Sequence, residues 1–336
     1  MIVESHRLNK IFANLKDLPI AVVGDVMLDR YIWGNAERIS QEAPVPIVSV
    51  EHETTRLGGA ANVAWNVRSL GAKPLLFGVI GDDLFAQKFL KLLNNFEIDE
   101  NFLAVDNARP TTSKTRIIAR GQQVLRIDRE NYIDISDKVE KKLLDKIIDS
   151  LDDVSAIIIS DYGKGVISRS FLKKLIPIAH KKNKFIAVDP KERHFKIYKN
   201  VSIITPNTKE AGDAVGIKIH DYDTLLKAGK KLKKLTMAKN ILITRGSDGM
   251  SLFYDDSSIK NFPTVARQVY DVTGAGDTVA GVFASIVASG GTLDEAAIIS
   301  SHAAGIVVGE IGTATANVQE IEKSIQFERT KQGSRK

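Results

Sequence analysis

The segment from Asp271 to Asp277 carries the strongest chemical signal in the chain. It reads Asp-Val-Thr-Gly-Ala-Gly-Asp and runs directly into an apolar stretch with helical character. Small residues at the start of a helix let several free backbone N–H groups point at one anion, and the helix dipole strengthens that attraction. A carboxylate in the first helical turn can then accept a proton from a hydroxyl group. The segment therefore suits phosphoryl transfer, although a plain turn with Asp277 as a helix cap fits the spacing equally well.

Two common phosphate-binding motifs do not occur. The pattern G-x-G-x-x-G lacks its third glycine, because Gly274 and Gly276 are followed by Val279. The pattern G-x-x-x-x-G-K-[ST] is found nowhere in the chain, which excludes a P-loop enzyme.

Two further segments combine small or polar residues at the start of an expected helix. Gly58 and Gly59 would let a ligand lie against the backbone, and Asn62 offers a donor and an acceptor for hydroxyl groups. Asn207 and Glu210 have the spacing of a capping box. They equally place an amide and a carboxylate at the carboxyl edge of a parallel sheet, where Glu210 could hold hydrated Mg²⁺. The first segment is also compatible with a simple loop-to-helix turn that exposes Asn62.

The elements that must position these residues alternate between strands and helices. Near-continuous apolar runs predict buried parallel strands, and the stretches between them have helical periodicity. The expected strands are 20–24, 75–80, 156–160, 185–188, 202–205 and 241–244. The expected helices are 60–70, 84–94, 137–151, 170–182, 209–215, 223–235, 276–289 and 293–308. This order predicts an α/β sandwich with a mostly parallel sheet.

Polar or glycine-rich loops follow five of the strands and meet at one edge of that sheet. They include Asp161-Tyr-Gly-Lys164-Gly165, Asp189-Pro-Lys191 and Thr244-Arg-Gly246-Ser-Asp-Gly249. Their convergence favours a ligand site more than any single motif does.

Two segments interrupt the alternation. Residues 31–52 and 111–129 read as half-exposed antiparallel strands, the second pair turning near Gly121. We expect them to form a small inserted β lid on a single domain covering residues 1–320, followed by a basic tail at 321–336. Lid-to-lid pairing in a homodimer and a cover over the site within one chain both fit.

Composition excludes several classes of function. The chain of 336 residues has no cysteine, so disulfides, thiol nucleophiles and cysteine-ligated metals are absent. The net charge of 47 − 41 = +6 comes largely from residues 227–239 and from the tail. Leucines recur at helical spacing among the lysines of 227–239, which indicates a solvated helix face over a core and argues against a nucleic-acid site. No histidine pair has ligand spacing. No secretory signal or membrane-length apolar run occurs, and we expect a cytoplasmic protein without membrane contact.

Three motifs in a fixed order resemble the PfkB, or ribokinase-like, sugar kinases. They are Gly58-Gly59-Ala-Ala-Asn62, Asn207-x-x-Glu210 and the segment ending at Asp277. Six further stretches are similar to the members that act on D-glycero-β-D-manno-heptose 7-phosphate: 23–31, 39–46, 122–123, 160–165, 189–191 and 269–278. The resemblance spans about 15–318. Many relatives carry a nucleotidyltransferase with an H-x-G-H motif, which does not occur in this sequence, so only the kinase part is expected.

The resemblance implies a ribokinase-like three-layer α/β/α fold and ATP-dependent phosphorylation of the anomeric hydroxyl, giving heptose 1,7-bisphosphate for lipopolysaccharide inner-core synthesis. Asp277 would be the base, and Gly274, Ala275 and Gly276 would donate N–H groups to the phosphoryl group. ATP and Mg²⁺ would lie near Asn207, Thr208, Lys209, Glu210, Thr244, Gly246, Gly249 and His302, with Glu210 as the metal ligand. Another sugar kinase of the family, or a non-catalytic sugar- or nucleotide-binding regulator, remains the alternative.

For the sugar, the resemblance implies contacts with hydroxyl groups and with a phosphate. The hydroxyl side would include Asp25, Asp29, Gly58, Gly59, Asn62 and Asp161. The 7-phosphate needs cations, and the candidates are Lys114, Arg116, Arg120, Arg126, Lys164 and Lys191. Arginine in particular suits bidentate phosphate contacts.

Overall fold

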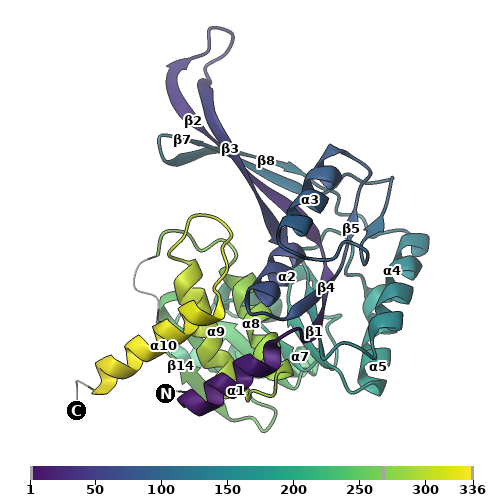
Figure 1. Cartoon of the computed structure of the whole chain (residues 1–336), viewed down its shortest axis with the longest axis vertical. Helices are drawn as coiled ribbons and strands as arrows, with labels where there is room; N and C mark the ends of the chain where they lie inside the picture. Colours follow the sequence, from purple (N-terminus) through teal and green to yellow (C-terminus); the bar gives the residue numbers. More distant parts are fainter. Residues whose placement is uncertain (1–2, 266–268, 334–336) are drawn as a thin grey trace.

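An eight-stranded sheet forms the centre of the computed structural model, which describes residues 3–265 and 269–333 (Figure 1). In spatial order its strands are β14 (Ile259–Phe262), β13 (Met250–Phe253), β12 (Asn240–Thr244), β11 (Ile203–Ile204), β10 (Phe185–Asp189), β9 (Ala156–Ser160), β1 (Pro19–Gly24) and β4 (Lys73–Phe77). The strands from β12 to β4 are parallel, and β13 and β14 add an antiparallel edge. The predicted strands are confirmed, except that 75–80 divides at Gly78 into β4 and the separate strand β5 (Val79–Ile80), which pairs with β6 (Ala104–Val105).

Helices cover both faces of the sheet. One face carries α1 (Ser5–Leu15), α2 (Ala60–Ser69), α3 (Leu84–Asn95), α8 (Ala275–Ala288), α9 (Leu293–Val307) and α10 (Val318–Gly333). The other carries α4 (Asp137–Ser150), α5 (Arg169–Lys181), α6 (Thr208–Val215) and α7 (Tyr222–Thr236). Alternate side chains of β1 enter opposite cores, since Ile20 and Val22 pack on the first face and Ala21 and Val23 on the second. The three-layer α/β/α prediction is confirmed.

The lysine-rich segment forms α7 as expected. Leu225 and Leu232 are buried, while Lys227, Lys230 and Lys234 face solvent. The segment expected as a basic tail is helical from Val318 to Gly333 and buries Ile321 against the first core; residues 334–336 lie outside the described part. Within the described ranges, no helix combines the length and apolarity required to cross a membrane.

A second, four-stranded sheet stands off the body as a lid. Its order is β3 (Pro46–Gly59), β2 (Val26–Ile39), β7 (Ser113–Ala119) and β8 (Gln122–Arg129). The hairpin of β2 and β3 projects farthest from the sandwich (Figure 1). The predicted lid is confirmed, but its first hairpin extends beyond 31–52 at both ends, from Val26 to Gly59. Strand β2 pairs with β7 in parallel, so the sheet is not antiparallel throughout.

Candidate active site

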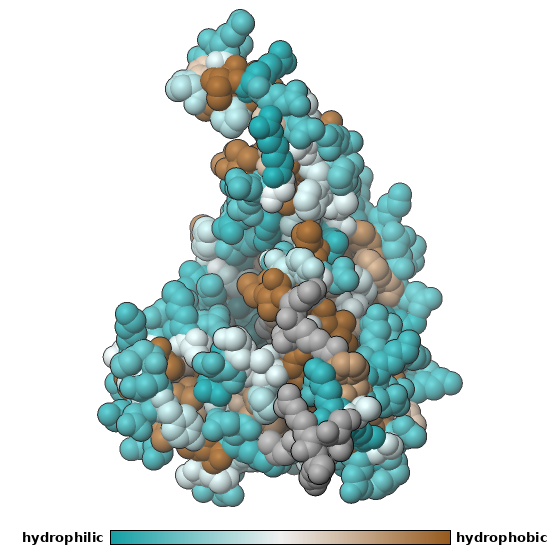
Figure 2. Space-filling view, turned by 90° about the vertical axis from the view of Figure 1, so that its left-hand side faces the viewer, coloured by the Kyte–Doolittle hydropathy of each residue, from teal (hydrophilic) through white to brown (hydrophobic). Residues whose placement is uncertain are grey.

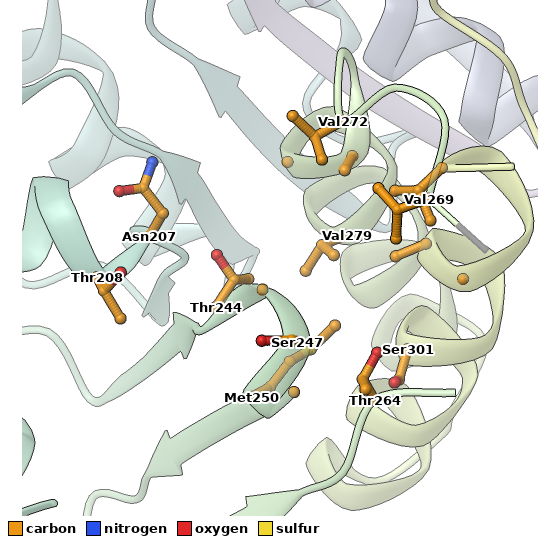
Figure 3. Close-up of a pocket in the computed structure, with 17 residues that line it drawn as sticks. Asn207, Thr208, Thr244, Ser247, Met250, Thr264, Val269, Val272, Val279 and Ser301 are labelled. Atoms are coloured by element: carbon orange, nitrogen blue, oxygen red, sulfur yellow. The ribbon is translucent and has the colours of Figure 1, made fainter. Parts of the chain in front are cut away.

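A cleft of about 650 Å³ lies between the loop after β12 and the start of α8 (Figure 3). Asn207 and Thr208 lie on one side, Val272 and Val279 on the other, and Thr244, Ser247 and Met250 between them. Gly246, Gly249, Ala275 and Gly276 also line it. A largely apolar cleft with a few polar groups beside a helix N-terminus is suited to a nucleotide, that is, to a nucleobase and its phosphates.

A smaller space of about 130 Å³ adjoins this cleft at the first turn of α8. It shares Asn207, Thr244 and Gly276 with the cleft and reaches Asp277. Its other walls include Asp161, Tyr162, Asp189, Lys191 and Glu210. The predicted convergence of strand-end loops therefore holds for the loops after β9, β10, β11 and β12, which lie around Asp277.

Asp277 is buried and both of its carboxylate oxygens accept a hydrogen bond. The Asn62 Nδ2 atom donates to Oδ2 at 2.9 Å, and the Tyr162 hydroxyl donates to Oδ1 at 2.9 Å. Burial raises the pKa of Asp277 to about 7, against these two hydrogen bonds, which favour the ionised form. A carboxylate with a pKa near neutrality matches the requirements of a general base.

The glycines around Asp277 are required by close packing of the protein itself. A Cβ atom on Gly58 would lie 2.3 Å from Asp29 Oδ2, and one on Gly59, where φ is +58°, would lie 2.3 Å from the Asp25 carbonyl oxygen. Asn62 is fully buried in α2, which excludes the alternative of a simple turn that exposes its side chain. The glycine pair thus lets β3 pack closely against β2 and lets Asn62 lie beside Asp277.

Asp25 anchors the loop that follows β9. Its carboxylate accepts the backbone N–H groups of Tyr162, Lys164 and Val166 at 2.9, 3.0 and 3.1 Å. Asp161 is likewise buried, and it accepts the Tyr198 hydroxyl at 2.6 Å and the Gly163 N–H at 2.7 Å. Neither carboxylate is free, so both hold this loop in shape whatever else they contact.

Asn207 and Glu210 form the capping box expected at the start of α6. The Asn207 side chain accepts the Glu210 N–H, and Glu210 Oε2 accepts the Asn207 N–H, each at 2.9 Å. Asp189 lies in the same small space, and burial together with the charges of Asp277 and Glu210 raises its pKa well above the usual range. In the described ranges no three carboxylate, His or Cys side chains are grouped for a metal. Asp189 and Glu210 line the same small space, and carboxylate oxygens of this kind fit a hydrated Mg²⁺ that phosphates would also hold.

Two residues expected near ATP are not among the residues that line the cleft. Lys209 is exposed and pairs with Glu192 and Asp213. His302 is buried in α9, contacts Ser324 at 2.7 Å and lines a separate pocket, and burial lowers its pKa to about 4. The side chains of both residues contact other residues of the protein, and their expected contacts with the nucleotide stay a prediction.

Three of the cations expected at the 7-phosphate are paired with carboxylates. Lys114 and Lys164 both contact Glu130, at 3.2 and 2.7 Å, and Arg116 pairs with Asp29. Although burial opposes ionisation, hydrogen bonds from Lys164 and Tyr132 lower the pKa of Glu130 to about 2. A further two cations are solvent-exposed: Arg120 at the β7–β8 turn and Arg126, which pairs with Asp128.

Three of the residues that shape the site were not singled out by sequence reasoning. Tyr162 and Asp189 lie inside quoted motifs, but only contacts across the fold reveal their roles. Glu130 follows the second lid hairpin and gives no signal in the sequence.

The family model described as "pfkB family carbohydrate kinase" matches residues 18–320 of this chain. The chain belongs to this family. It is 44% identical over 302 residues to the bifunctional protein HldE of Wolinella succinogenes, covering 90% of this chain and 63% of that protein. It is 39% identical over 325 residues to the protein of the same name from Geobacter sulfurreducens, covering 97% and 66%. This kinase chain thus spans slightly less than two thirds of these relatives.

Solved structures of low sequence identity share the fold of this carbohydrate kinase. Arabidopsis thaliana ribokinase, complexed with ribose and ATP, superposes with a TM-score of 0.73 at 19% identity and covers 92% of this chain and 99% of its own. Escherichia coli phosphofructokinase-2 with substrates and products gives 0.74 at 16% identity, covering 92% and 98%. The ribokinase-like expectation for the fold is confirmed.

Proposed function

We propose that this kinase transfers the γ-phosphoryl group of ATP to the anomeric hydroxyl of D-glycero-β-D-manno-heptose 7-phosphate, yielding the 1,7-bisphosphate that leads to ADP-heptose and the lipopolysaccharide inner core. The observation that carries the proposal is the position of Asp277, buried at the junction of the cleft and the small space and held by Asn62 and Tyr162. The family membership, the heptose-kinase motifs and the similarity to HldE proteins support the substrate.

In the proposed reaction Asp277 accepts the proton of the sugar hydroxyl as the oxygen–phosphorus bond forms and ADP leaves. The backbone N–H groups of Gly274 and Gly276, at the positive end of α8, would stabilise the charge on the transferred group. The third expected donor, the Ala275 N–H group, is already used within the protein, because it donates to the Val272 carbonyl at 3.2 Å. We therefore assign the anion-binding role to the two glycines.

The nucleotide would occupy the larger cleft. Thr244, Gly246 and Gly249 border it on the β12 side, and Gly249 must remain glycine because its φ is +82° and an added Cβ would lie 2.0 Å from the Phe262 carbonyl oxygen. Glu210 would hold Mg²⁺, which supplies neutralisation of phosphate charge when bound. The Glu210 carboxylate is oriented for this by the Asn207 N–H.

For the 7-phosphate we propose a contribution from the lid and sheet-edge cations. Lys191 lines the space beside Asp277, while Arg116 lies at the lid base on Asp29. The test is a charge-removing series at Arg116, Arg120 and Lys191. A rise in KM for the phosphorylated sugar in at least one variant is expected, and an unchanged KM in all three would refute this part.

We also propose a homodimer that forms through the lid. Three apolar side chains of the lid, Val50, Leu125 and Ile127, are each more than half exposed. Figure 2 shows hydrophobic side chains among hydrophilic ones on the surface of the projecting lid. Ile127→Glu should shift the mass measured by light scattering from dimer to monomer, whereas Ile148→Glu, on the surface of α4, should not. A monomeric unmodified protein would contradict the proposal.

One experiment tests the activity itself. The protein is incubated with Mg·ATP and a panel of free and 7-phosphorylated heptoses, with ribose and fructose, and the new phosphate is located by NMR. We expect a C1 phosphate on heptose 7-phosphate and a loss of at least ~10²-fold in turnover for Asp277→Asn. Asp221→Asn, which changes an exposed cap of α7, is the matched control.

Other outcomes of this experiment decide between the alternatives. Turnover of free ribose or fructose in place of the heptose would identify another sugar kinase of the family. Ligand binding without any turnover would identify a non-catalytic regulator.

A further inference from the structure

The loop after β9 delivers a phenol to the carboxylate of Asp277. The Tyr162 hydroxyl lies 2.9 Å from Oδ1, on the opposite oxygen from the Asn62 amide. The two donors come from different parts of the fold, α2 and the β9 loop, and Asp277 comes from α8. The carboxylate is therefore held from two sides, which restricts its rotation about the bond to Cβ.

The position of the phenol is fixed by buried backbone contacts. The Tyr162 N–H donates to Asp25, and the next residue, Gly163, donates to Asp161. Gly163 and Gly165 have φ values of +68° and +91°, which side chains with a Cβ rarely adopt. The loop thus has one shape, and that shape directs the tyrosine hydroxyl at Asp277.

We propose that Tyr162 is a positioning residue that holds the Asp277 carboxylate in its ionised, proton-accepting form. This inference rests on the proposed function, since it assigns Tyr162 a role through the base. The amide nitrogen of Asn62 can only donate, whereas a phenol both donates and accepts. Tyr162 can therefore donate to the carboxylate before the transfer and keep a favourable contact once Asp277 has taken the sugar proton. The phenol keeps its own proton throughout, so the proton balance of the reaction is unchanged.

The surroundings of Asp277 make this contact important. Burial and the negative charge of Asp29 on β2 disfavour its ionisation, and Asp189 at the end of β10 faces the same space, with Glu210 and Lys191 beyond it. The hydrogen bonds from Asn62 and Tyr162 oppose these effects. Burial and the charge of Asp277 also raise the pKa of Tyr162 well above its usual value, so the phenol remains a donor.

The test measures the titration of Asp277 directly, without substrate. Aspartate is labelled with ¹³C at the carboxyl carbon, and the Asp277 resonance is identified by its loss in Asp277→Asn. Tyr162→Phe removes the donor to the charged form and should raise the midpoint by about one to two pH units. The acidic limb of the kcat/KM profile should move by the same amount.

Tyr198→Phe is the matched control, because Tyr198 is a neighbouring buried phenol that donates to Asp161 and does not contact Asp277. It should leave the Asp277 midpoint in place. If Tyr162→Phe does not fold, 3-fluorotyrosine at position 162 replaces it. That residue keeps the ring and is a stronger donor, so it should lower the midpoint.

An unchanged midpoint with the Tyr162 replacement, or an equal shift in Tyr198→Phe, would overturn the inference. Failure of the proposed function is a separate result. It would appear as absent turnover in the unmodified protein, while the substrate-free titration would still report on Tyr162.

Discussion

The glycines at 274 and 276 offer a matched pair for testing how the start of α8 is built. Gly274 caps the helix with φ at +82°, and an added Cβ would lie 2.8 Å from Asn62 Nδ2 and 3.3 Å from Thr313 Cγ2. At Gly276, within the first turn, an added Cβ would meet nothing within 4 Å. The same substitution, glycine to alanine, therefore has opposite consequences two residues apart.

The expected magnitudes follow from these contacts. A left-handed backbone costs a residue with a Cβ about 1–2 kcal/mol, before any displacement of Asn62. Alanine in a helix is favoured over glycine by about 0.5–1 kcal/mol. Gly274→Ala should therefore unfold more easily than the unmodified protein and Gly276→Ala less easily, with a difference of roughly 2–3 kcal/mol between the two variants.

Urea denaturation of the two variants measures this difference and needs no substrate. Gly274→Ala should also lose about tenfold in turnover, because pushing the Asn62 amide away removes a hydrogen bond to the charged Asp277. Equal stability of the two variants, or greater stability of Gly274→Ala, would refute the reasoning about the close approach of Asn62.

Three more predictions concern ionisation and the nucleotide. Turnover should fall as the pH drops below about 7, because Asp277 accepts a proton only when ionised; a profile flat down to pH 5 would contradict this. The folded pKa of Asp277 exceeds its usual value, so its contribution to stability is lost as the pH rises. The free energy of unfolding of the unmodified protein, relative to Asp277→Asn, should therefore decrease from pH 4 to about pH 7 and then level off, as followed by urea titrations across that range. His302→Ala should lower the melting temperature without changing the KM for ATP, since His302 faces Ser324; a raised KM would restore it to the nucleotide site.

Much of the fold could be predicted because buried parallel strands leave a clear pattern. Strand β9 matches its expected range, 156–160, and helix α2 ends within one residue of its own expected end at 70. Continuous apolar runs and glycine boundaries mark these elements in the sequence. The antiparallel edge strands β13 and β14 were missed, since four-residue strands beside turns give little periodicity. The two terminal helices α1 and α10 were not expected either.

The candidate site was predictable in its position but not in its contacts. Strand ends converge in any parallel sheet, so the loops that carry Asp161, Asp189 and Asn207 were expected to meet at one edge. The place of Asp277 beside them was implied by the family resemblance. The link between Tyr162 and Asp277 joins residues 115 positions apart and depends on the shape of the β9 loop. The pairing of Lys114 and Lys164 with Glu130 likewise depends on side chains from separate elements, which no local pattern encodes.

The way in which the lid joins the body has a mechanical consequence. Strand β2 starts directly after Asp25, and β3 ends at Gly59, directly before the helix that carries Asn62. The two strands of the outer hairpin therefore join the body on either side of Asp277, so a tilt that reached their lower ends would act on Asp25 at one side and on Asn62 at the other. Because the chain contains no cysteine, single thiols introduced at the tip and on the body would carry spin labels without a background signal. Distances between such labels would report directly how far the tip of the outer hairpin moves relative to the body.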